Sequence, residues 1–285
     1  MIAITGASGQ LGRLVIDNLL KKVSPQEIIA VVRNPEKVKD LANRGVQIRR
    51  ADYDLPETLD QAFEGVDKLL MISANEVGRR TPQHRAVINA AKRAGVKFIA
   101  YTSLLHADKS PLPLAKEHRE TEALLRESGI PFALLRNGWY TENYIASVPA
   151  AFQHGVLLGS AGEGRISSAA RSDYAEAAAT VITRDDQAGR IYELAGDGAY
   201  TLAELAAETT RHSGNEVKYQ NLPEAEFKAA LIGVGLPEWL ATLLAESDVG
   251  ASKGGLFDDN RQLSQLIGRS TTPLSTLVNQ ALALR

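Results

Sequence analysis

A short apolar run that breaks into a glycine-rich turn opens the chain. Residues 1–12 read Met-Ile-Ala-Ile-Thr-Gly-Ala-Ser-Gly-Gln-Leu-Gly, and apolar residues then recur at helical spacing as far as Leu19. This pattern predicts a strand, a tight turn and a helix. Gly6 lets the chain turn off the strand, Gly9 lets bare backbone approach an anion, and Gly12 lets the helix pack closely against the strand. Because the first N–H groups of a helix lack partners within it, the turn is predicted to cradle a phosphate group.

An alternation of strands and helices supplies the context that this turn needs, since three glycines alone also fit a turn that binds nothing. Further buried strands are expected at residues 27–32, 46–53, 68–73, 96–103 and 132–136, with a helix at 81–94. Strands that recur at intervals of about thirty residues, with helices between them, are typical of βαβ units. The sequence therefore predicts an α/β fold with a doubly wound, Rossmann-type parallel sheet.

Composition excludes several classes of function. The 285 residues carry a formal net charge of −2, with acidic and basic residues interleaved, so neither nucleic acid nor a membrane surface is an expected partner. The absence of cysteine removes disulfides, thiol nucleophiles and cysteine-ligated metals, and no metal site is expected. No secretory signal or membrane-spanning stretch is recognised. We therefore expect a cytoplasmic protein that acts on a small molecule, with homo-oligomerisation left open.

The ends of two predicted strands indicate which dinucleotide would bind. Arg33 follows the second strand, where an acidic residue would bond the ribose 2′-hydroxyl of NAD and an arginine suits the 2′-phosphate of NADP. We therefore expect NADP(H), the alternative being a solvated arginine that opens a loop. Ser73, Ala74 and Asn75 follow the fourth strand, and they are expected to line the cofactor or to form an ordinary polar loop.

Among three other polar residues, Asp52 and His84 have more than one interpretation. Asp52 and Tyr53 end the third predicted strand and would flank an adenine, but Asp52 is equally suited to cap the helix expected at residues 56–63. His84 lies among arginine and glutamine on the helix at 81–94. It is interpreted as a solvated or locally bonded side chain and not as a catalyst.

Six segments of the sequence together resemble one protein family. They are residues 5–12, 32–35, 101–103, 104–108, 134–140 and 252–259. The chain resembles the NmrA-like branch of the atypical short-chain dehydrogenase/reductase superfamily, and within that branch it is similar to bacterial NAD(P)H:quinone oxidoreductases and their triphenylmethane reductase relatives. The resemblance runs nearly end to end, so it is more specific than a single glycine motif.

The resemblance also reveals a missing proton donor. The superfamily places a Tyr four residues before a Lys and a Glu four residues after it; fitting this frame puts Leu114, His118 and Glu122 at the three positions. Leucine cannot donate a proton, so Tyr/Lys chemistry on a carbonyl is not supported. Reduction of a quinone gives a weakly basic hydroquinone anion that water can protonate, and such a substrate needs mainly a positioned hydride donor.

The function that the resemblance implies is NADPH-dependent two-electron reduction of quinones by direct hydride transfer, without flavin or metal. The alternatives are reduction of triarylmethane-type dyes and a non-catalytic NADP(H) redox sensor of the NmrA type. Two residues are candidates for catalysis. His118 would aim at substrate or at the nicotinamide ribose, or else bond a neighbouring backbone group. Ser103 would bond a quinone oxygen, or else cap the next segment.

The complete set of expected cofactor contacts combines the glycine-rich turn with the strand ends. Residues 137–142 and Tyr174 enter through the resemblance, although aromatic residues after a strand are also often core. The set is Gly6, Ala7, Ser8, Gly9, Gln10, Leu11, Gly12, Arg33, Ser73, Ala74, Asn75, Asn137, Gly138, Trp139, Tyr140, Thr141, Glu142 and Tyr174.

The second half of the chain loses the even alternation of strands and helices. We expect a cofactor-binding Rossmann domain at residues 1–150 and a smaller α+β substrate or lid lobe at 151–285, with a strand near 190–195 returning to the main sheet. Thr201 and Glu204 form a predicted capping box. The other expected elements are a loop at 159–164, a helix from 172, an edge strand at 216–221, helices at 224–233, 237–246 and 260–267, and a mobile or merely connecting loop at 249–257.

Overall fold

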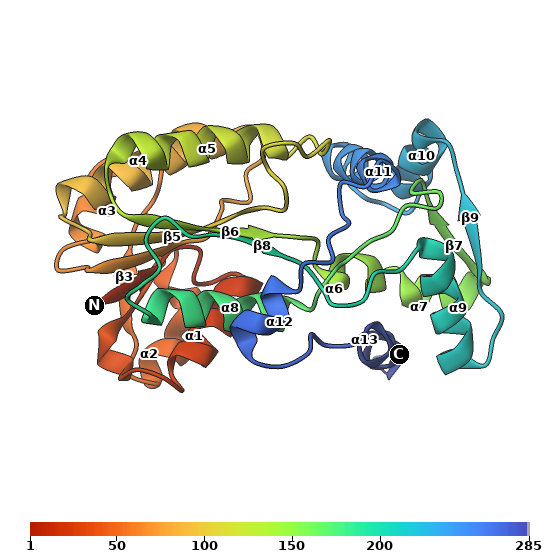
Figure 1. Cartoon of the computed structure of the whole chain (residues 1–285), viewed down its shortest axis with the longest axis horizontal. Coiled ribbons are helices and arrows are strands. Elements are labelled where there is room, and N and C mark those ends of the chain that lie inside the picture. Colours follow the sequence, from red (N-terminus) through yellow and green to blue (C-terminus); the bar gives the residue numbers. More distant parts are fainter. Residues whose placement is uncertain (284–285) are drawn as a thin grey trace. The chain divides into compact units, whose positions relative to one another are not determined.

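The computed structural model describes residues 1–283 (Figure 1). The chain forms two compact units. The first unit comprises residues 1–107, 116–137 and 171–192, and the second comprises 108–115, 138–170 and 193–285. Neither unit is a continuous stretch of sequence, because the chain enters and leaves each of them more than once. The expected assignment of cofactor binding to residues 1–150 stays a prediction.

A seven-stranded sheet organises the first unit, with strand order β3-β2-β1-β4-β5-β6-β8. The pairs from β3 through to β6 are all parallel. The strands are β1 (Ile2–Ile4), β2 (Ile28–Val32), β3 (Gln47–Arg50), β4 (Lys68–Met71), β5 (Phe98–Leu104), β6 (Phe132–Asn137) and β8 (Ile191–Leu194). The reversal of strand order beside β1 is that of a doubly wound sheet, so the predicted Rossmann-type α/β fold is confirmed.

Helices cover both faces of this sheet, and for that reason its central strands are continuous apolar runs. Helices α3 (Pro56–Ala62), α4 (Arg80–Arg93) and α5 (Ala115–Ser128) lie on one face, and α1 (Gln10–Leu19) and α8 (Arg171–Thr183) lie on the other (Figure 1). The core under the first three helices includes Leu59, Ile88 and Leu125 packed with residues of the strands. Short helical segments η1 (Pro25–Glu27), η2 (Pro35–Val38) and α2 (Lys39–Asn43) complete the unit's first half.

The register of the parallel strands brings several loops to one edge of the sheet. Ile4 pairs with Ala30 of β2 on one side and with Leu70 of β4 on the other. The loops that follow β1, β2 and β4 are therefore neighbours.

The third strand is shorter than expected, since the 46–53 stretch is a strand only at Gln47–Arg50. Asp52 does not cap α3, whose N-cap is Leu55; its Oδ1 accepts the N–H of Asp54 over 3.1 Å.

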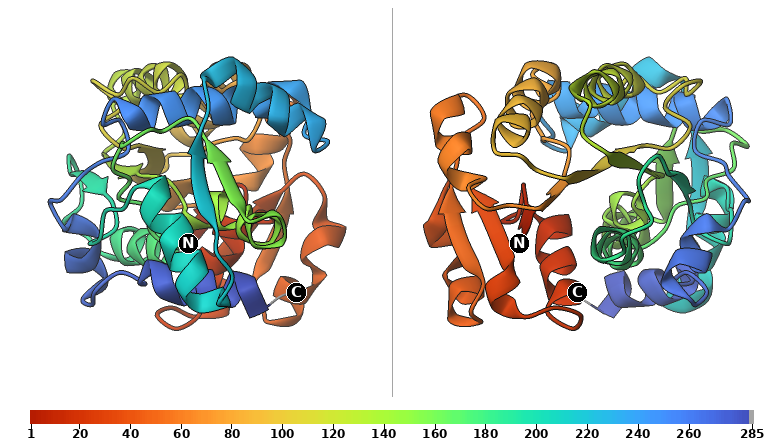
Figure 2. Two further views of the ribbon diagram at one scale, coloured as in Figure 1. Left: turned by 90° about the vertical axis from the view of Figure 1, so that its right-hand side faces the viewer. Right: turned by 60° about the vertical axis from the view of Figure 1, so that its left-hand side comes forward.

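The second unit is built on a small parallel sheet and a set of helices. Strands β7 (Val156–Gly159) and β9 (Lys218–Asn221) pair in parallel and lie side by side in Figure 2. The helices are α6 (Thr141–Ile145), α7 (Val148–His154), α9 (Leu202–Ser213), α10 (Glu224–Gly233), α11 (Glu238–Ser252), α12 (Gln262–Ile267) and α13 (Leu274–Ala283). The edge strand predicted at 216–221 is thus confirmed at Lys218–Asn221, whereas β7, α6, α7 and α13 were not predicted.

Two further expectations about this unit have opposite outcomes. The predicted capping box is present at the start of α9: Thr201 Oγ1 accepts the N–H of Glu204, and Glu204 Oε2 accepts the N–H of Thr201 over 2.7 Å. The loop expected at 249–257 is wrong in its first part, because α11 continues through Ser252.

Across residues 1–283, no helix combines the length and the apolar character needed to cross a membrane.

Candidate cofactor site

The glycine-rich turn after β1 has the form that its sequence predicts. Gly6 adopts a φ of 62°, in the left-handed region that glycine tolerates. The N–H of Gly9 donates to the carbonyl oxygen of Gly6 over 2.9 Å, and α1 begins directly after Gly9. A Cβ atom at Gly12 would lie 2.5 Å from the Gly6 oxygen and 2.8 Å from the Cα atom of Ala7. The helix therefore packs against the turn at a distance that only glycine allows.

The start of α1 is open for an anion. Its N-cap, Gly9, supplies no side-chain cap, and the first turn of α1 contains no acidic residue. Gly6, Ser8, Gly9 and Gln10 are exposed, whereas Ala7, Leu11 and Gly12 are buried and have only backbone to offer. Bare N–H groups at a helix N-terminus suit a pyrophosphate, so the residues present fit a dinucleotide at this turn.

Arg33 lies where β2 ends, and its side chain is 60% exposed. Its Nη1 atom lies 2.9 Å from Oε1 of Glu76, which belongs to the loop after β4. The structure thus places the predicted guanidinium at the edge of the sheet where an adenosine ribose is expected. It also places an acidic residue beside Arg33 that sequence reasoning missed. The signal for Glu76 was its position directly after the expected contacts Ser73–Asn75.

The loop Ser73–Asn75 lies beside the glycine-rich turn. Just before the loop, the N–H of Ile72 donates to Thr5 Oγ1 over 3.1 Å, which ties the segment after β4 to the end of β1. The N–H of Ser73 donates to Thr102 Oγ1 over 2.9 Å. Ser73 and Ala74 are half-buried and Asn75 is exposed. The structure therefore brings two of the predicted cofactor-lining segments together.

His84 fixes this loop: of its two interpretations, the locally bonded side chain is confirmed and the solvated one is wrong. His84 is fully buried: its Nε2 accepts the N–H of Ala74 over 2.9 Å, and its Nδ1 lies 2.8 Å from Oγ1 of Thr121. Since Nε2 is an acceptor, Nδ1 carries the hydrogen. Burial, and secondarily the nearby charge of Arg80, lowers the pKa of His84 to about 3. The neutral imidazole is therefore a local structural partner of Ala74.

His118 lies on α5 in a closed environment. Its side chain is 4% exposed, and its Nδ1 lies 2.8 Å from the hydroxyl oxygen of Tyr101, which lies on β5. Burial, followed by the charges of Arg80 and His84, sets the pKa of His118 well below its ordinary value. Burial also raises the pKa of the Tyr101 hydroxyl. The pair is therefore neutral at physiological pH, and Tyr101, which sequence reasoning did not connect with His118, is fully buried.

Ser103 is bound to charged groups inside the first unit. Its hydroxyl donates to Oε1 of Glu122 over 2.7 Å. The two oxygens of Glu122 accept from Nε and Nη2 of Arg136 over 2.9 and 2.8 Å, and all three side chains are buried. The hydroxyl hydrogen of Ser103 is thus used in the bond to Glu122. The role of Ser103 in bonding a quinone oxygen stays a prediction.

The expected contacts at residues 137–142 divide between the two units. Asn137 ends β6 in the first unit; it is 6% exposed, and its Oδ1 is buried with no hydrogen-bond partner among the described residues. Such an oxygen suits a donor from a ligand. In the second unit, Tyr140 is the N-cap of α6 and Thr141 Oγ1 lies 2.8 Å from Ser168 Oγ. Gly138 is buried, and Trp139 and Glu142 are half-buried. Tyr174, on α8, is 1% exposed.

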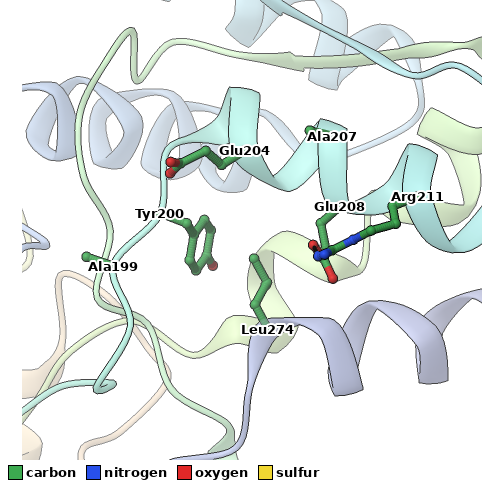
Figure 3. A pocket seen from close by; sticks show the side chains of 7 residues that line it. All are labelled: Ala199, Tyr200, Glu204, Ala207, Glu208, Arg211 and Leu274. Atoms are coloured by element: carbon green, nitrogen blue, oxygen red, sulfur yellow. Dashed lines mark ion pairs between the residues drawn. The ribbon is translucent and has the colours of Figure 1, made fainter.

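The second unit has hollows of its own. One, of about 460 Å³, is lined by Ala199, Tyr200, Glu204, Ala207, Glu208, Arg211 and Leu274, and Figure 3 shows the Glu208–Arg211 ion pair at its wall. None of the predicted site residues lines it. Another, of about 420 Å³, includes Thr141 from the predicted set. Among residues 1–283, no cluster of three or more His, Asp or Glu is arranged to hold a metal.

Comparison with known proteins agrees with the geometry of the turn. The model of a family described as NAD(P)H-binding matches residues 6–185. Quinone oxidoreductase 2 of Escherichia coli is 62% identical over 279 residues, which cover 98% of each chain.

Solved structures show the same relationship. The crystal structure of the Escherichia coli NADPH-dependent quinone oxidoreductase in complex with NADPH matches with a TM-score of 0.97, covering 99% of this chain and 100% of that one at 62% identity. The NADP(H) complex of triphenylmethane reductase from Citrobacter sp. matches with a TM-score of 0.96 and 42% identity, over 99% and 100% of the two chains. The chain therefore belongs to the NAD(P)H-binding family, with quinone oxidoreductase 2 and triphenylmethane reductase among its relatives.

Proposed function

We propose that this protein is an NADPH-dependent oxidoreductase that reduces quinones by direct hydride transfer. The observation that carries the proposal is its 62% identity, over 98% of both chains, to quinone oxidoreductase 2. The open N-terminus of α1 behind Gly6, Gly9 and Gly12 supports dinucleotide binding, and Arg33 supports the 2′-phosphate form of the cofactor. NADPH bound there supplies the hydride.

The residues of the chain then bind and orient the cofactor and the substrate. Backbone N–H groups at the start of α1 hold the pyrophosphate, and the loop Ser73–Asn75, fixed by His84, lines the cofactor beside the turn. The Oδ1 of Asn137, which has no hydrogen-bond partner within residues 1–283, is suited to accept a hydrogen bond from the carboxamide of the nicotinamide. No residue is assigned as a proton donor, because Leu114 stands at the superfamily's tyrosine position and His118 is buried and neutral.

We place cofactor binding in residues 1–150 and contacts with substrate in the lobe at 151–285. The partner is a small quinone-like molecule, and the location is the cytoplasm. The net charge of −2, without a basic cluster, supports a protein that binds neither nucleic acid nor a membrane surface.

A direct assay tests the function. Purified protein is mixed with NADPH and a benzoquinone-type acceptor without added flavin, and the loss of NADPH absorbance is followed. We expect oxidation that depends on the acceptor and saturates with both compounds. Tight NADPH binding without acceptor-dependent oxidation would contradict the proposal and favour a redox sensor.

Reduction of triarylmethane dyes is the second candidate, supported by the 42% identity and the TM-score of 0.96 to triphenylmethane reductase. The same assay with a cationic triarylmethane dye, followed by loss of the dye's colour, compares the two substrates. A kcat/KM for the dye that exceeds the value for benzoquinones would make the dye class the better description.

A further inference from the structure

One carboxylate joins two guanidinium groups at the edge of the sheet. Oε1 of Glu76 lies 2.9 Å from Nη1 of Arg33, and Oε2 lies 3.1 Å from Nη1 of Arg79. Arg33 directly follows β2, and Arg79 is the N-cap of α4. Both arginine side chains are 60% exposed, whereas that of Glu76 is 28% exposed. The carboxylate is therefore the inner member of the cluster, and the two cations face outward.

A buried amide fixes the position of this carboxylate. Gln83, on the first turn of α4, is 4% exposed, and its Nε2 donates to Oε2 of Glu76 over 3.0 Å. The Oε1 of Gln83 is buried and has no hydrogen-bond partner among the residues that the structure describes. An exposed ion pair by itself contributes little to stability. Glu76, in contrast, accepts from three donors, one directly after β2 and two at the start of α4, which keeps its charge in one place.

The location of this charge concerns the ribose of the cofactor. Strands β2 and β4 flank β1, so the Arg33–Glu76 pair joins the two loops on either side of the glycine-rich turn. The end of β2 lacks the acidic residue that binds the 2′-hydroxyl of NAD, because Arg33 stands there. Glu76, in the loop after β4, places a carboxylate beside this same guanidinium.

We propose that Glu76 is a specificity-determining residue that lets the protein use NADH as well as NADPH. This inference rests on the proposed function, since it assumes that the 2′-position lies at Arg33. The Glu76 carboxylate accepts a hydrogen bond from the 2′-hydroxyl of NADH and repels the 2′-phosphate of NADPH. Arg33 and Arg79 attract that phosphate, and both already contact oxygens of one anionic group, although Nη2 of Arg79 also pairs with Oδ2 of Asp54 over 3.0 Å. The opposing charges limit the discrimination between the two cofactors.

Direct binding measurements test this proposal without relying on turnover. The dissociation constants of NADPH and NADH are measured by fluorescence titration for wild type, Glu76→Gln and Arg79→Gln. Glu76→Gln keeps a similar shape and removes the charge, and we expect about tenfold tighter NADPH binding and about threefold weaker NADH binding. Arg79→Gln is expected to weaken NADPH binding about fivefold and to leave NADH binding within twofold.

Asp60→Asn is the matched control, because Asp60 is also paired with an arginine of α4. Its partner is Arg93, at the opposite end of the helix and about 20 Å from Arg79 at 1.5 Å per residue. We expect Asp60→Asn to leave the NADPH/NADH ratio unchanged.

The outcomes separate this inference from the proposed function. A ratio that stays within twofold of wild type in Glu76→Gln overturns the inference, as does a parallel change in both dissociation constants, which is the result of a purely structural role. Absence of quinone reduction alone contradicts the proposed function and leaves the binding ratio as the test of Glu76.

Discussion

Glu122 binds the guanidinium of Arg136 with both carboxylate oxygens, over 2.9 and 2.8 Å, inside the first unit. Both side chains are almost fully buried, at 2% and 6% exposure. Ser103 donates its hydroxyl hydrogen to the same carboxylate. The serine at the end of β5 thus belongs to a buried charged network, and the resemblance to the superfamily does not by itself make it available to a substrate.

The first prediction concerns the stability of this network. Glu122→Gln removes the charge that compensates a buried guanidinium, and we expect the free energy of unfolding to fall by about 3 kcal/mol or more. Arg126→Ala is the control, because Arg126 contacts the same carboxylate at 3.2 Å from an exposed position and should cost less than about 1 kcal/mol. Urea denaturation at pH 7 measures both values. Equal losses of unfolding free energy in the two variants would show that the buried Glu122–Arg136 pair contributes no more to stability than the exposed contact of Arg126 with Glu122.

The second prediction concerns His118. Because its imidazole is buried, neutral and bonded to Tyr101, it is not placed to deliver a proton in each turnover. We expect His118→Ala to lower kcat for quinone reduction by less than about a hundredfold, the lower end of what a lost general acid costs. His154→Ala, at an exposed end of α7, is the control and should leave kcat unchanged.

Kinetics over a range of pH would reveal the outcome that contradicts this prediction. If His118→Ala lowers kcat much further, leaves NADPH binding intact and removes an inflection from the pH profile of kcat, proton transfer through His118 limits turnover. The prediction would then be wrong.

The first unit could be predicted from sequence because its signals are local. Strand β2 is a continuous apolar run bounded by polar residues, and all five of its residues are buried. The glycine-rich turn is recognisable from three glycines at fixed spacing, Gly6, Gly9 and Gly12. In the second unit, β7 becomes a strand only by pairing with β9, some sixty residues later in the chain. Its four residues alone, Val156–Gly159, carry too little pattern to distinguish a strand from a loop.

Several site residues were beyond sequence reasoning because they depend on packing between elements. Tyr101 lies in an apolar strand, and its contact with His118 arises only when α5 packs on β5. The polar neighbours of His84 on α4 left open whether its side chain is solvated or locally bonded, and only the packing of the helix shows that it turns inward to Ala74. Glu76 lies in a loop of ordinary composition, and only the register of β2, β1 and β4 places it beside Arg33.

The third prediction tests the close packing at the glycine-rich turn. In Gly12→Ala the new Cβ atom would lie 2.5 Å from the Gly6 carbonyl oxygen, so the turn and α1 must separate. We expect NADPH binding to weaken more than about tenfold and stability to fall by about 1–3 kcal/mol, the usual cost of overpacking.

Gly233→Ala is the control for the third prediction. Gly233 ends α10, and a Cβ atom there meets nothing within 4 Å. Because alanine favours a helix over glycine by up to about 1 kcal/mol, this variant should be equally or slightly more stable and should bind NADPH normally. Fluorescence titration and thermal melting measure both variants. Normal NADPH binding by Gly12→Ala would contradict the assigned role of the turn.

The fourth prediction concerns Asp248, a buried acid of α11 in the second unit. Its Oδ2 accepts the N–H of Ser160 over 2.8 Å, and the hydroxyl of Tyr144 lies 3.4 Å from its Oδ1. Burial raises the pKa of Asp248 to about 6, although both of these hydrogen bonds act in the opposite direction. The folded protein therefore holds this proton more tightly than the unfolded chain does.

Because the pKa of Asp248 is higher in the folded protein than in the unfolded chain, stability falls as the pH rises. The favourable contribution of protonated Asp248 is fully present below about pH 4, the ordinary range for Asp, and is lost as the pH rises through about 6. Above that pH the buried charge costs about 3 kcal/mol, at about 1.4 kcal/mol per pKa unit. Asp248→Asn keeps an acceptor for Ser160 and cannot ionise, so urea denaturation should show it more stable than wild type by about 2–3 kcal/mol at pH 8 and nearly equal at pH 4. Asp259→Asn, at an exposed position, should match wild type at both pH values. A stability difference for Asp248→Asn that is the same at pH 4 and pH 8 would mean that Asp248 does not titrate in this range.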